Sequence, residues 1–538
     1  MRVLVAEAIS QKGIELLREQ HEVDVKKLTK EELLEQIGLY DAVITRSETK
    51  ITADVLRAGT RLKVVGRAGV GVDNIDVEAA TERGVVVVNV PGANTLSTAE
   101  HAFGLLLALA RHIPQAHNAL VKDGRWDRKT YVGTEVYGKV LGIIGLGRIG
   151  SEVAIRARAF GMKLHAYDPY VSTARAEQLG VTLVPAVADL LPVVDFLSIH
   201  AAKTSESAKL IGRGELAKMR RGARIINCAR GGMVDEDALY EAIVEGQIGG
   251  AALDVFATEP CTEHKLFTLP NVVATPHLSA STIEAQEANG TYIAQYVLRV
   301  LAGELVPEAV NLPPVPTEQG QELVRHLPLA EALGSFLAQA YPDRYEAIEV
   351  IYSGELAALP TTLATNSVLK GFLGAQLGEA VNYINAPTLA RRRGLRVQES
   401  KVTAHPHEGK RPELAPEASL VTVRAEGAQG EYRIAGMLRR DGGIRFTAID
   451  GLPIDMAPSR TMLVTRHQDR PGMVGKLGTL LGTADINIAG LHLSRKDVRG
   501  EALMLMQVDD LLSAPLLEQI RQVDGIVAAQ AVALPGLE

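Results

Sequence analysis

Three polar residues each follow a short apolar run between residues 223 and 280: Arg230 in N-C-A-R-G-G, Glu259 in D-V-F-A-T-E-P and His277 in T-P-H-L-S-A-S-T. Short apolar runs bounded by turn residues are typical of buried strands, and the carboxyl ends of parallel strands share one edge of a sheet. Histidine takes up a proton near neutral pH, a carboxylate stabilises the imidazolium, and an arginine fork orients a carboxylate. Each residue is ordinary when taken singly, but their joint placement predicts a site that removes a proton from a small, negatively charged alcohol.

Oxidation of an alcohol releases a hydride as well as a proton, and a glycine loop upstream predicts a bound dinucleotide as the hydride acceptor. The strand-like run Val140 to Ile144 is followed by Gly145, Gly147 and Gly150 in G-x-G-x-x-G spacing. The first glycine allows a tight turn, the second lets the backbone approach a pyrophosphate, and the third packs the new helix closely, so that its free N–H groups face the pyrophosphate. A triplet alone often serves turn geometry only, but Asp168 closes the next apolar run, 18 residues past Gly150, where an acid accepts from a ribose 2′-hydroxyl. Because that carboxylate would repel a 2′-phosphate, the sequence predicts NAD rather than NADP.

Two arginines near the start of the chain are candidate anion clamps. Arg46 and Arg67 each come just past a predicted strand, and Gly69 frees backbone N–H groups beside Arg67. A solvated surface arginine is the alternative for either one alone. Cys228, beside Arg230, has no partnered histidine nearby in sequence, so we expect it to pack rather than to react.

The elements that position these residues form two repeats of strand and helix. Residues 1–97 alternate short apolar strands with helical stretches, residues 98–281 repeat the pattern around the glycine loop, and a long helix over 283–301 is expected to return the chain to the first domain. We predict a discontinuous substrate domain (1–97 and 282–310) and an NAD-binding domain (98–281), both doubly wound parallel α/β sheets. The apolar helix predicted over Thr98–His112 must be buried, and we expect it at a domain or subunit interface.

The second half of the chain predicts two further modules. Four prolines in residues 306–320 indicate a semi-rigid linker. Residues 318–455 alternate strands with helices predicted over Leu329–Ala340 and Ala375–Tyr383, which indicates an α+β domain whose Arg391–Arg393 run binds an anion or, more simply, faces solvent. Residues 460–538 show the β-α-β-β-α-β order of the ferredoxin-like motif and offer no nucleophile, so we expect binding there rather than chemistry.

Composition narrows the classes of partner. The chain of 538 residues is too long for one core, and its net charge of −7 gives no field for nucleic acid or anionic membrane. The longest apolar run, Ala102 to Ala110, is far shorter than the ~20 residues of a membrane span, and the first residues lack the layout of a signal peptide. Two cysteines make neither a disulfide framework nor a zinc cluster. We therefore expect a soluble cytoplasmic protein with no metal, nucleic-acid or membrane partner.

As a set, G-L-G-R-I-G, N-C-A-R-G-G, D-V-F-A-T-E-P and P-H-L-S-A-S-T resemble the D-2-hydroxyacid dehydrogenase family, and G-R-A-G-V-G-V-D-N-I-D with D-R-P-G resembles its long members. The resemblance implies catalysis by Arg230, Glu259 and His277 with NAD, and oxidation of 3-phosphoglycerate to 3-phosphohydroxypyruvate, the entry step of serine synthesis. Dinucleotide contacts would fall on Gly145, Gly147, Arg148, Ile149, Gly150, Asp168, Cys228, Ala229, Asp254, Ser279 and Ala280. Substrate contacts would fall on Arg46, Arg67, Gly69 and Asn94, with Arg128 at a position that reaches a neighbouring subunit's site.

The same resemblance implies regulation and assembly. The tail resembles an ACT domain that binds L-serine as effector, with Asp469 and Asn487 at the ligand positions, the middle segment resembles an intervening domain that can carry a second anion site, and the subunits would form a homotetramer. Three positions depart from the family pattern: Ala202 replaces a proline, Ser279 a glycine and His467 a tyrosine. Two alternatives stay open: a related enzyme for an unphosphorylated acid such as glycerate or glyoxylate, and an NAD-sensing binding protein. A metal-dependent hydrolase is disfavoured because the sequence has no ligand cluster.

Overall fold

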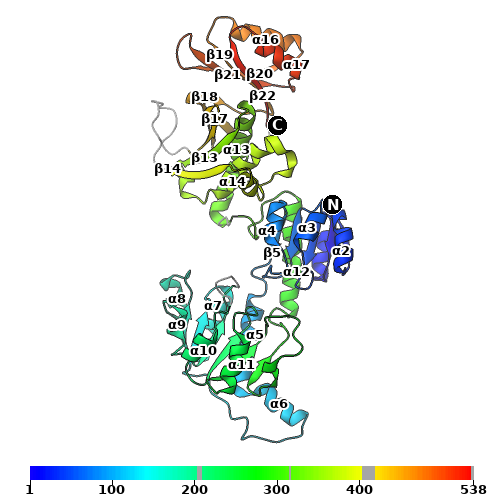
Figure 1. Cartoon of the computed structure of the whole chain (residues 1–538), viewed down its shortest axis with the longest axis vertical. Helices are drawn as coiled ribbons and strands as arrows, with labels where there is room; N and C mark the ends of the chain where they lie inside the picture. Colours follow the sequence, from blue (N-terminus) through cyan, green and yellow to red (C-terminus); the bar gives the residue numbers. More distant parts are fainter. Residues whose placement is uncertain (203–208, 314–316, 403–418, 535–538) are drawn as a thin grey trace.

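The computed structural model describes residues 1–202, 209–313, 317–402 and 419–534. These residues build four sheets along an elongated molecule (Figure 1). The sheet built by residues 140–274 lies at one end, the N-terminal sheet lies next to it, and the C-terminal sheet lies at the other end. Residues 314–316 of the predicted linker, 403–418 of the predicted intervening domain and 535–538 of the last domain lie outside the described residues.

The first sheet has five parallel strands in the order β2-β1-β3-β4-β5. Alternate residues of its buried strands face two different layers, one formed by α1 and α12 and the other by α2, α3 and α4. Helix α12 therefore brings the chain back to the sheet that it left before residue 100. The elements are β1 (Arg2–Val5), α1 (Gln11–Arg18), β2 (Glu22–Val25), α2 (Lys30–Gln36), β3 (Ala42–Thr45), α3 (Ala53–Ala58), β4 (Val64–Arg67), α4 (Val77–Glu82), β5 (Val86–Asn89) and α12 (Ile283–Leu301).

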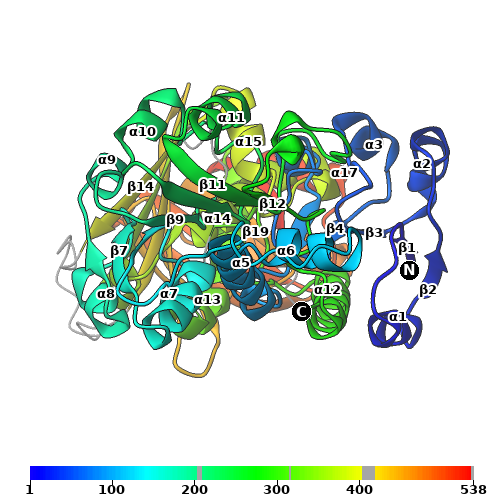
Figure 2. The same cartoon turned by 90° about the horizontal axis from the view of Figure 1, so that it is seen from below.

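The second sheet has seven parallel strands in the order β12-β11-β10-β9-β6-β7-β8. Strand β6 lies between β9 and β7, so the strand order reverses there, and ligands of such sheets bind at that switch point. Helices α5 and α7 cover one face and α10 and α11 the other (Figure 2). The elements are α5 (Thr95–Arg111), α6 (Ile113–Val121), β6 (Val140–Ile144), α7 (Arg148–Ala159), β7 (Lys163–Tyr167), α8 (Thr173–Leu179), β8 (Thr182–Leu183), α9 (Val187–Leu190), β9 (Phe196–Ile199), α10 (Arg213–Lys218), β10 (Ala223–Asn227), α11 (Glu236–Val244), β11 (Ile248–Leu253) and β12 (Val272–Ala274).

The third sheet is mixed, in the order β14-β13-β15-β16-β17-β18, with α13 and α14 packed against each other and against its apolar face. The helix predicted over Ala375–Tyr383 is wrong, because Gly378 adopts a left-handed φ of 68° and ends α14 at Leu377. Most of α14 is buried, so its sequence lacks the one-sided pattern that would have revealed it. The elements are α13 (Thr317–Ala340), β13 (Tyr345–Ser353), α14 (Thr362–Leu377), α15 (Ala386–Arg392), β14 (Arg396–Val402), β15 (Leu420–Gly427), β16 (Gly430–Leu438), β17 (Ile444–Ile449) and β18 (Leu452–Met456).

The fourth sheet is antiparallel, in the order β20-β21-β19-β22, and its β-α-β-β-α-β succession confirms the predicted ferredoxin-like motif. One face carries α16 and α17, and the other packs on the core of the third sheet through Met462, Val464, Leu503, Leu505 and Val532. No helix of the described ranges has the length and apolar character of a membrane span. The elements are β19 (Thr461–Gln468), α16 (Met473–Thr483), β20 (Ile488–Arg495), β21 (Glu501–Val508), α17 (Ala514–Arg521) and β22 (Ile526–Ala533).

Candidate active site

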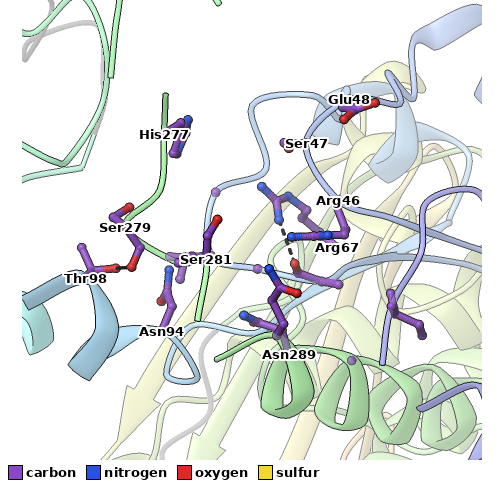
Figure 3. Close-up of a pocket in the computed structure, with 18 of the residues that line it drawn as sticks. Arg46, Ser47, Glu48, Arg67, Asn94, Thr98, His277, Ser279, Ser281 and Asn289 are labelled. Carbon is purple, nitrogen blue, oxygen red and sulfur yellow. Dashed lines mark hydrogen bonds between the residues drawn. The ribbon is translucent and has the colours of Figure 1, made fainter. Parts of the chain in front are cut away.

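A cavity of about 1290 Å³ lies between the first and second sheets and takes its walls from both. The first sheet supplies the segments around Arg46 and Arg67, and the second supplies Arg230, Glu259 and His277. Figure 3 shows Arg46 and Arg67 beside each other, with His277 and Ser279 on another segment of the wall. The volume exceeds that of a usual pocket for one small molecule, so a small acid and the end of a dinucleotide fit together.

His277 and Glu259 form a hydrogen-bonded pair. The Nδ1 atom of His277 lies 2.8 Å from Oε2 of Glu259, while Oε1 of Glu259 accepts from the backbone N–H of Phe256 at 3.0 Å. Burial would raise the pKa of Glu259, but these hydrogen bonds lower it below its ordinary value. The carboxylate is therefore ionised at neutral pH and fixes the imidazole so that Nε2 is the nitrogen left for proton transfer.

Asp254 builds the loop that carries His277. Its carboxylate accepts from the backbone N–H groups of Leu278 at 2.7 Å and Ser279 at 2.9 Å, and from the Thr275 hydroxyl at 2.6 Å. Nε2 of His101 lies 3.2 Å from the same carboxylate. Burial would raise the pKa of Asp254, but the hydrogen bonds from His101, Thr275 and Leu278 lower it. Asp254, predicted as a cofactor contact, is a fully buried anion that shapes the loop beneath His277.

Arg230 is held by contacts from both domains. Its Nε donates to Oδ2 of Asp73 at 3.0 Å, across the cleft, and its Nη1 donates to the backbone oxygen of Ala229 at 2.7 Å. Asn227, at the end of β10, shapes this turn by donating to the backbone oxygen of Arg230 and accepting from the N–H of Ala229, both at 3.0 Å. These contacts engage Nε and one N–H of Nη1, so Nη2 and the second N–H of Nη1 are the donors that can meet a substrate oxygen.

The glycine loop has the geometry that a dinucleotide requires. Gly145 adopts a left-handed φ of 88°, and a Cβ on Gly150 would collide with the backbone oxygen of Gly145. A Cβ on Gly147 would meet no atom of the described residues within 4 Å. Helix α7 begins at Arg148, and no side chain of the described residues caps its N-terminal N–H groups; Ile149 lines the cavity. Asp168 accepts from the N–H of Leu146 at 2.8 Å, which ties the end of β7 to the loop. The residues present therefore fit NAD: an open backbone for the pyrophosphate and an acid beside it for the ribose.

Arg67 and Asn94 are polar groups without a full set of partners. The Nη1 of Arg67 donates to the backbone oxygen of Ala68 at 3.0 Å, but its buried Nε and the buried Oδ1 of Asn94 meet no hydrogen-bond partner within the described parts of the chain. Burial, together with the charges of Arg230 and Arg46, lowers the pKa of Arg67 to about 10. Three guanidinium groups thus gather in one cavity, an arrangement that calls for an anionic ligand.

The remaining predicted residues divide between the cavity wall and distant positions. Gly69, Cys228, Ser279 and Ala280 line the cavity, and burial raises the pKa of the Cys228 thiol, which suits a packing role. Arg128 is exposed and does not line the cavity. In the ACT-like domain, Asp469 accepts from the backbone N–H of Arg499 at 3.1 Å, and Asn487 donates to Asp509 at 2.9 Å. His467 is buried, and neither ring nitrogen has a hydrogen-bond partner among the described residues.

Sequence reasoning missed Glu7, Asp73, His101 and Asn227. Asp73 and Asn227 lie inside the motifs quoted above, and Glu7 follows the end of β1, where the strand-end rule could have found it. His101 gives no local signal, because its partner Asp254 is 153 residues away. The described residues contain no group of three or more His, Cys, Asp or Glu side chains that could hold a metal ion.

The fold and the cavity together define a class. A histidine backed by a carboxylate and a group of arginines share one cavity between two parallel-sheet domains. Ile149, just past the dinucleotide-type glycine loop, lines the same cavity, and together these features are the arrangement of an NAD-dependent dehydrogenase of small hydroxy acids.

Comparison with known proteins narrows the class. Residues 103–279 match the family model of the D-isomer specific 2-hydroxyacid dehydrogenase NAD binding domain, residues 322–450 the D-3-phosphoglycerate dehydrogenase intervening domain, and residues 461–525 the ACT domain. The D-3-phosphoglycerate dehydrogenase of Synechocystis sp. is 46% identical over 99% of this chain and 95% of its own. That of Methanocaldococcus jannaschii is 43% identical over 98% of both chains.

Solved structures of related enzymes resemble the first two domains of this chain. A glyoxylate reductase from Paecilomyes thermophila superposes with a TM-score of 0.54 at 31% identity, covering 57% of this chain and 97% of its own. A D-lactate dehydrogenase from Aquifex aeolicus, complexed with NAD and lactic acid, gives a TM-score of 0.51 at 26% identity, covering 56% of this chain and 96% of its own. The chain therefore belongs to the D-isomer specific 2-hydroxyacid dehydrogenases and, within them, to the D-3-phosphoglycerate dehydrogenase family.

Proposed function

We propose that this protein oxidises 3-phospho-D-glycerate to 3-phosphohydroxypyruvate with NAD, the entry step of L-serine synthesis. The observation that carries the proposal is the meeting of Arg46, Arg67 and Arg230 in one cavity with the His277–Glu259 pair. Phosphoglycerate has an anionic group at each end and an alcohol between them, so several arginines and one base match its chemistry. The names of the full-length relatives support the same substrate.

Residues of this chain can be assigned to the proton transfer, to the orientation of the substrate and to the binding of NAD. Nε2 of His277 takes the proton of the substrate hydroxyl, and Glu259 stabilises the imidazolium that results. Arg230 offers its remaining N–H groups to the substrate carboxylate or the developing carbonyl, while bonds to Asp73 and Ala229 hold its guanidinium in place. NAD, when bound, supplies the acceptor for the hydride, and the glycine loop, the start of α7 and Asp168 are the groups that would hold it.

A substrate panel read by NADH absorbance tests this function. We expect turnover with 3-phosphoglycerate, and loss of most of it in His277→Ala. Arg46→Ala separates this proposal from a glycerate or glyoxylate enzyme, because it should damage phosphoglycerate turnover far more than glyoxylate turnover. Absence of turnover with every acid, while NADH still binds, would instead favour an NAD-sensing binding protein.

We also propose that the ACT domain binds L-serine near Asp469 and Asn487 and that serine lowers turnover. The polar side chains at the end of β19 and before β20 support an amino-acid ligand there. Added L-serine should reduce the rate of the wild-type protein but not of Asp469→Ala. Unchanged rates of the wild type at saturating serine would refute this regulation.

Assembly into a homotetramer is a further part of the proposal. The segment 113–137 exposes large apolar side chains, among them Trp126 at 80%, Tyr137 at 78% and Val132 at 75% of their surface. Such a surface is typical of a subunit contact, and it contains Arg128, which lies away from the cavity of its own chain. Sedimentation equilibrium of the wild type and of Trp126→Lys tests the contact, and a monomeric wild type would contradict it.

A further inference from the structure

Glu7 is an unassigned carboxylate that lies behind the loop of Arg46. It follows β1 in V-A-E-A, and its Oε1 accepts from the Thr45 hydroxyl at 2.8 Å and from the backbone N–H groups of Thr49 at 2.7 Å and Arg46 at 3.1 Å. The N–H of Glu48 donates to Oε1 at 3.1 Å, and the N–H of Ser47 donates to Oε2 at 3.2 Å. Four successive backbone N–H groups thus converge on one half-buried carboxylate, the geometry of an anion nest.

The nest keeps this carboxylate charged. Burial would raise the pKa of Glu7, but the backbone hydrogen bonds from Thr49, Arg46 and Glu48 and the hydroxyl of Thr45 lower it. Hydrogen bonds to an ionised acceptor are about twice as strong as neutral ones. Because these bonds fix consecutive residues, they determine the course of the whole loop from 45 to 49.

Asn74 holds the same loop through its carbonyl groups. Its side-chain amide donates to the backbone oxygens of Thr49 at 2.7 Å and Arg46 at 3.1 Å. Between these two anchors, Arg46 and Ser47 are presented to the cavity next to Arg67 (Figure 3). The negative charge of Glu7 also favours the charged form of Arg67, against the repulsion from Arg46 and Arg230.

We propose that Glu7 is a positioning residue, which holds the Arg46–Thr49 loop in the shape that binds the phosphate of the substrate. Glu7 itself does not line the cavity, so it acts through the loop that donates hydrogen bonds to it. This proposal rests on the proposed function, in which the Arg46 loop binds the phosphate of the substrate. Replacing Glu7 should therefore weaken the binding of a phosphorylated substrate only, whereas replacing a residue that only maintains the fold would affect every substrate.

The test compares Glu7→Gln and Glu7→Asp with wild type, using 3-phosphoglycerate and D-glycerate as substrates. In Glu7→Gln one oxygen remains, but an NH2 group replaces Oε2 and faces the N–H of Ser47. We expect KM for 3-phosphoglycerate to rise on the order of ten-fold, with kcat within about two-fold, and D-glycerate kinetics and the Kd for NADH unchanged. Glu7→Asp keeps the charge and should recover part of the affinity. Asp54→Asn, which removes an exposed acid of α3, is the matched control.

The outcomes separate the two proposals. If wild type does not prefer 3-phosphoglycerate over D-glycerate, the proposed function fails, whatever Glu7 does. If wild type shows that preference but Glu7→Gln has an unchanged KM, the positioning role is overturned. Equal losses with both substrates, weakened NADH binding, or failure of both variants to fold would also overturn it, because each would show that Glu7 supports the fold as a whole.

Discussion

Replacing Gly71 by alanine tests whether the position of the Arg230 guanidinium controls turnover. A Cβ on Gly71 would collide with Nη2 of Arg230 and would stand 2.9 Å from its Cζ and 3.0 Å from Oδ2 of Asp73. Ordinary contacts between carbon atoms are about 3.5–4.0 Å, so the guanidinium must retreat by roughly 1 Å. The φ of Gly71 lies outside the left-handed region, so the backbone itself accepts alanine.

The size of the effect follows from that displacement. A misplacement of about 1 Å in an orienting group costs about 100-fold in rate, or roughly 2.7 kcal/mol of transition-state stabilisation. The colliding atoms are the end of a flexible side chain rather than backbone, so the free energy of unfolding should change by less than about 1 kcal/mol. We therefore expect kcat/KM to fall about 100-fold while Tm and the Kd for NADH remain those of the wild type.

Initial rates in both directions, read by NADH absorbance, measure this effect beside thermal melts. Gly214→Ala in α10 is the neutral control, since a Cβ there meets no atom of the described ranges within 4 Å. Gly231→Ala is the contrasting control, because its Cβ would overlap the backbone oxygen of Phe256 and should lower Tm. Full turnover in Gly71→Ala, or a loss of activity that merely follows a fall in Tm, would refute the reasoning.

Three other expected outcomes depend on single groups. Glu259→Gln removes the charge that faces Nδ1 of His277, so kcat should fall at least ~100-fold while the Kd for NADH is unchanged, and an unaltered kcat would show that the carboxylate is dispensable. Burial lowers the pKa of His200 to about 4, so between that value and the ordinary pKa of ~6.5 the unfolded chain binds the extra proton. Stability should therefore fall by at most ~3 kcal/mol as the pH drops through this window, and thermal melts of His200→Gln that keep the wild-type slope would contradict this. Burial raises the pKa of the Cys228 thiol, so iodoacetamide at pH 8 should leave it unmodified in the native protein, whereas peptide mass spectrometry that finds it alkylated would count against this assignment.

The sequence was sufficient for features that depend on local pattern. Short apolar runs followed by glycines or polar residues predicted the two parallel sheets, because strand period and turn chemistry act over a few residues. The placement of Arg230, Glu259 and His277 after successive strands predicted their common cavity, because parallel strands end at one edge. The ferredoxin-like order at the C-terminus was predictable for the same reason.

Contacts between distant residues were beyond sequence reasoning. Asp73 reaches Arg230 across 157 residues and a domain boundary, and Glu7 meets a loop about 40 residues later, so neither pairing has a local signal. The resemblance predicts a cofactor contact for Asp254, but it gives no sign that the same carboxylate accepts from the loop that carries His277. Helix α14 was not predicted, because a helix that is buried on most sides lacks the periodic apolar pattern of a surface helix.

The shared core of the third and fourth sheets bears on how this protein tolerates truncation. Met462, Val464, Leu503, Leu505 and Val532 cover apolar side chains that belong to the preceding module. A chain cut before Thr461 would leave those side chains bare, and bare patches of this kind promote aggregation. Proteolytic loss of the last module should therefore precipitate the protein rather than release a shortened, soluble catalyst.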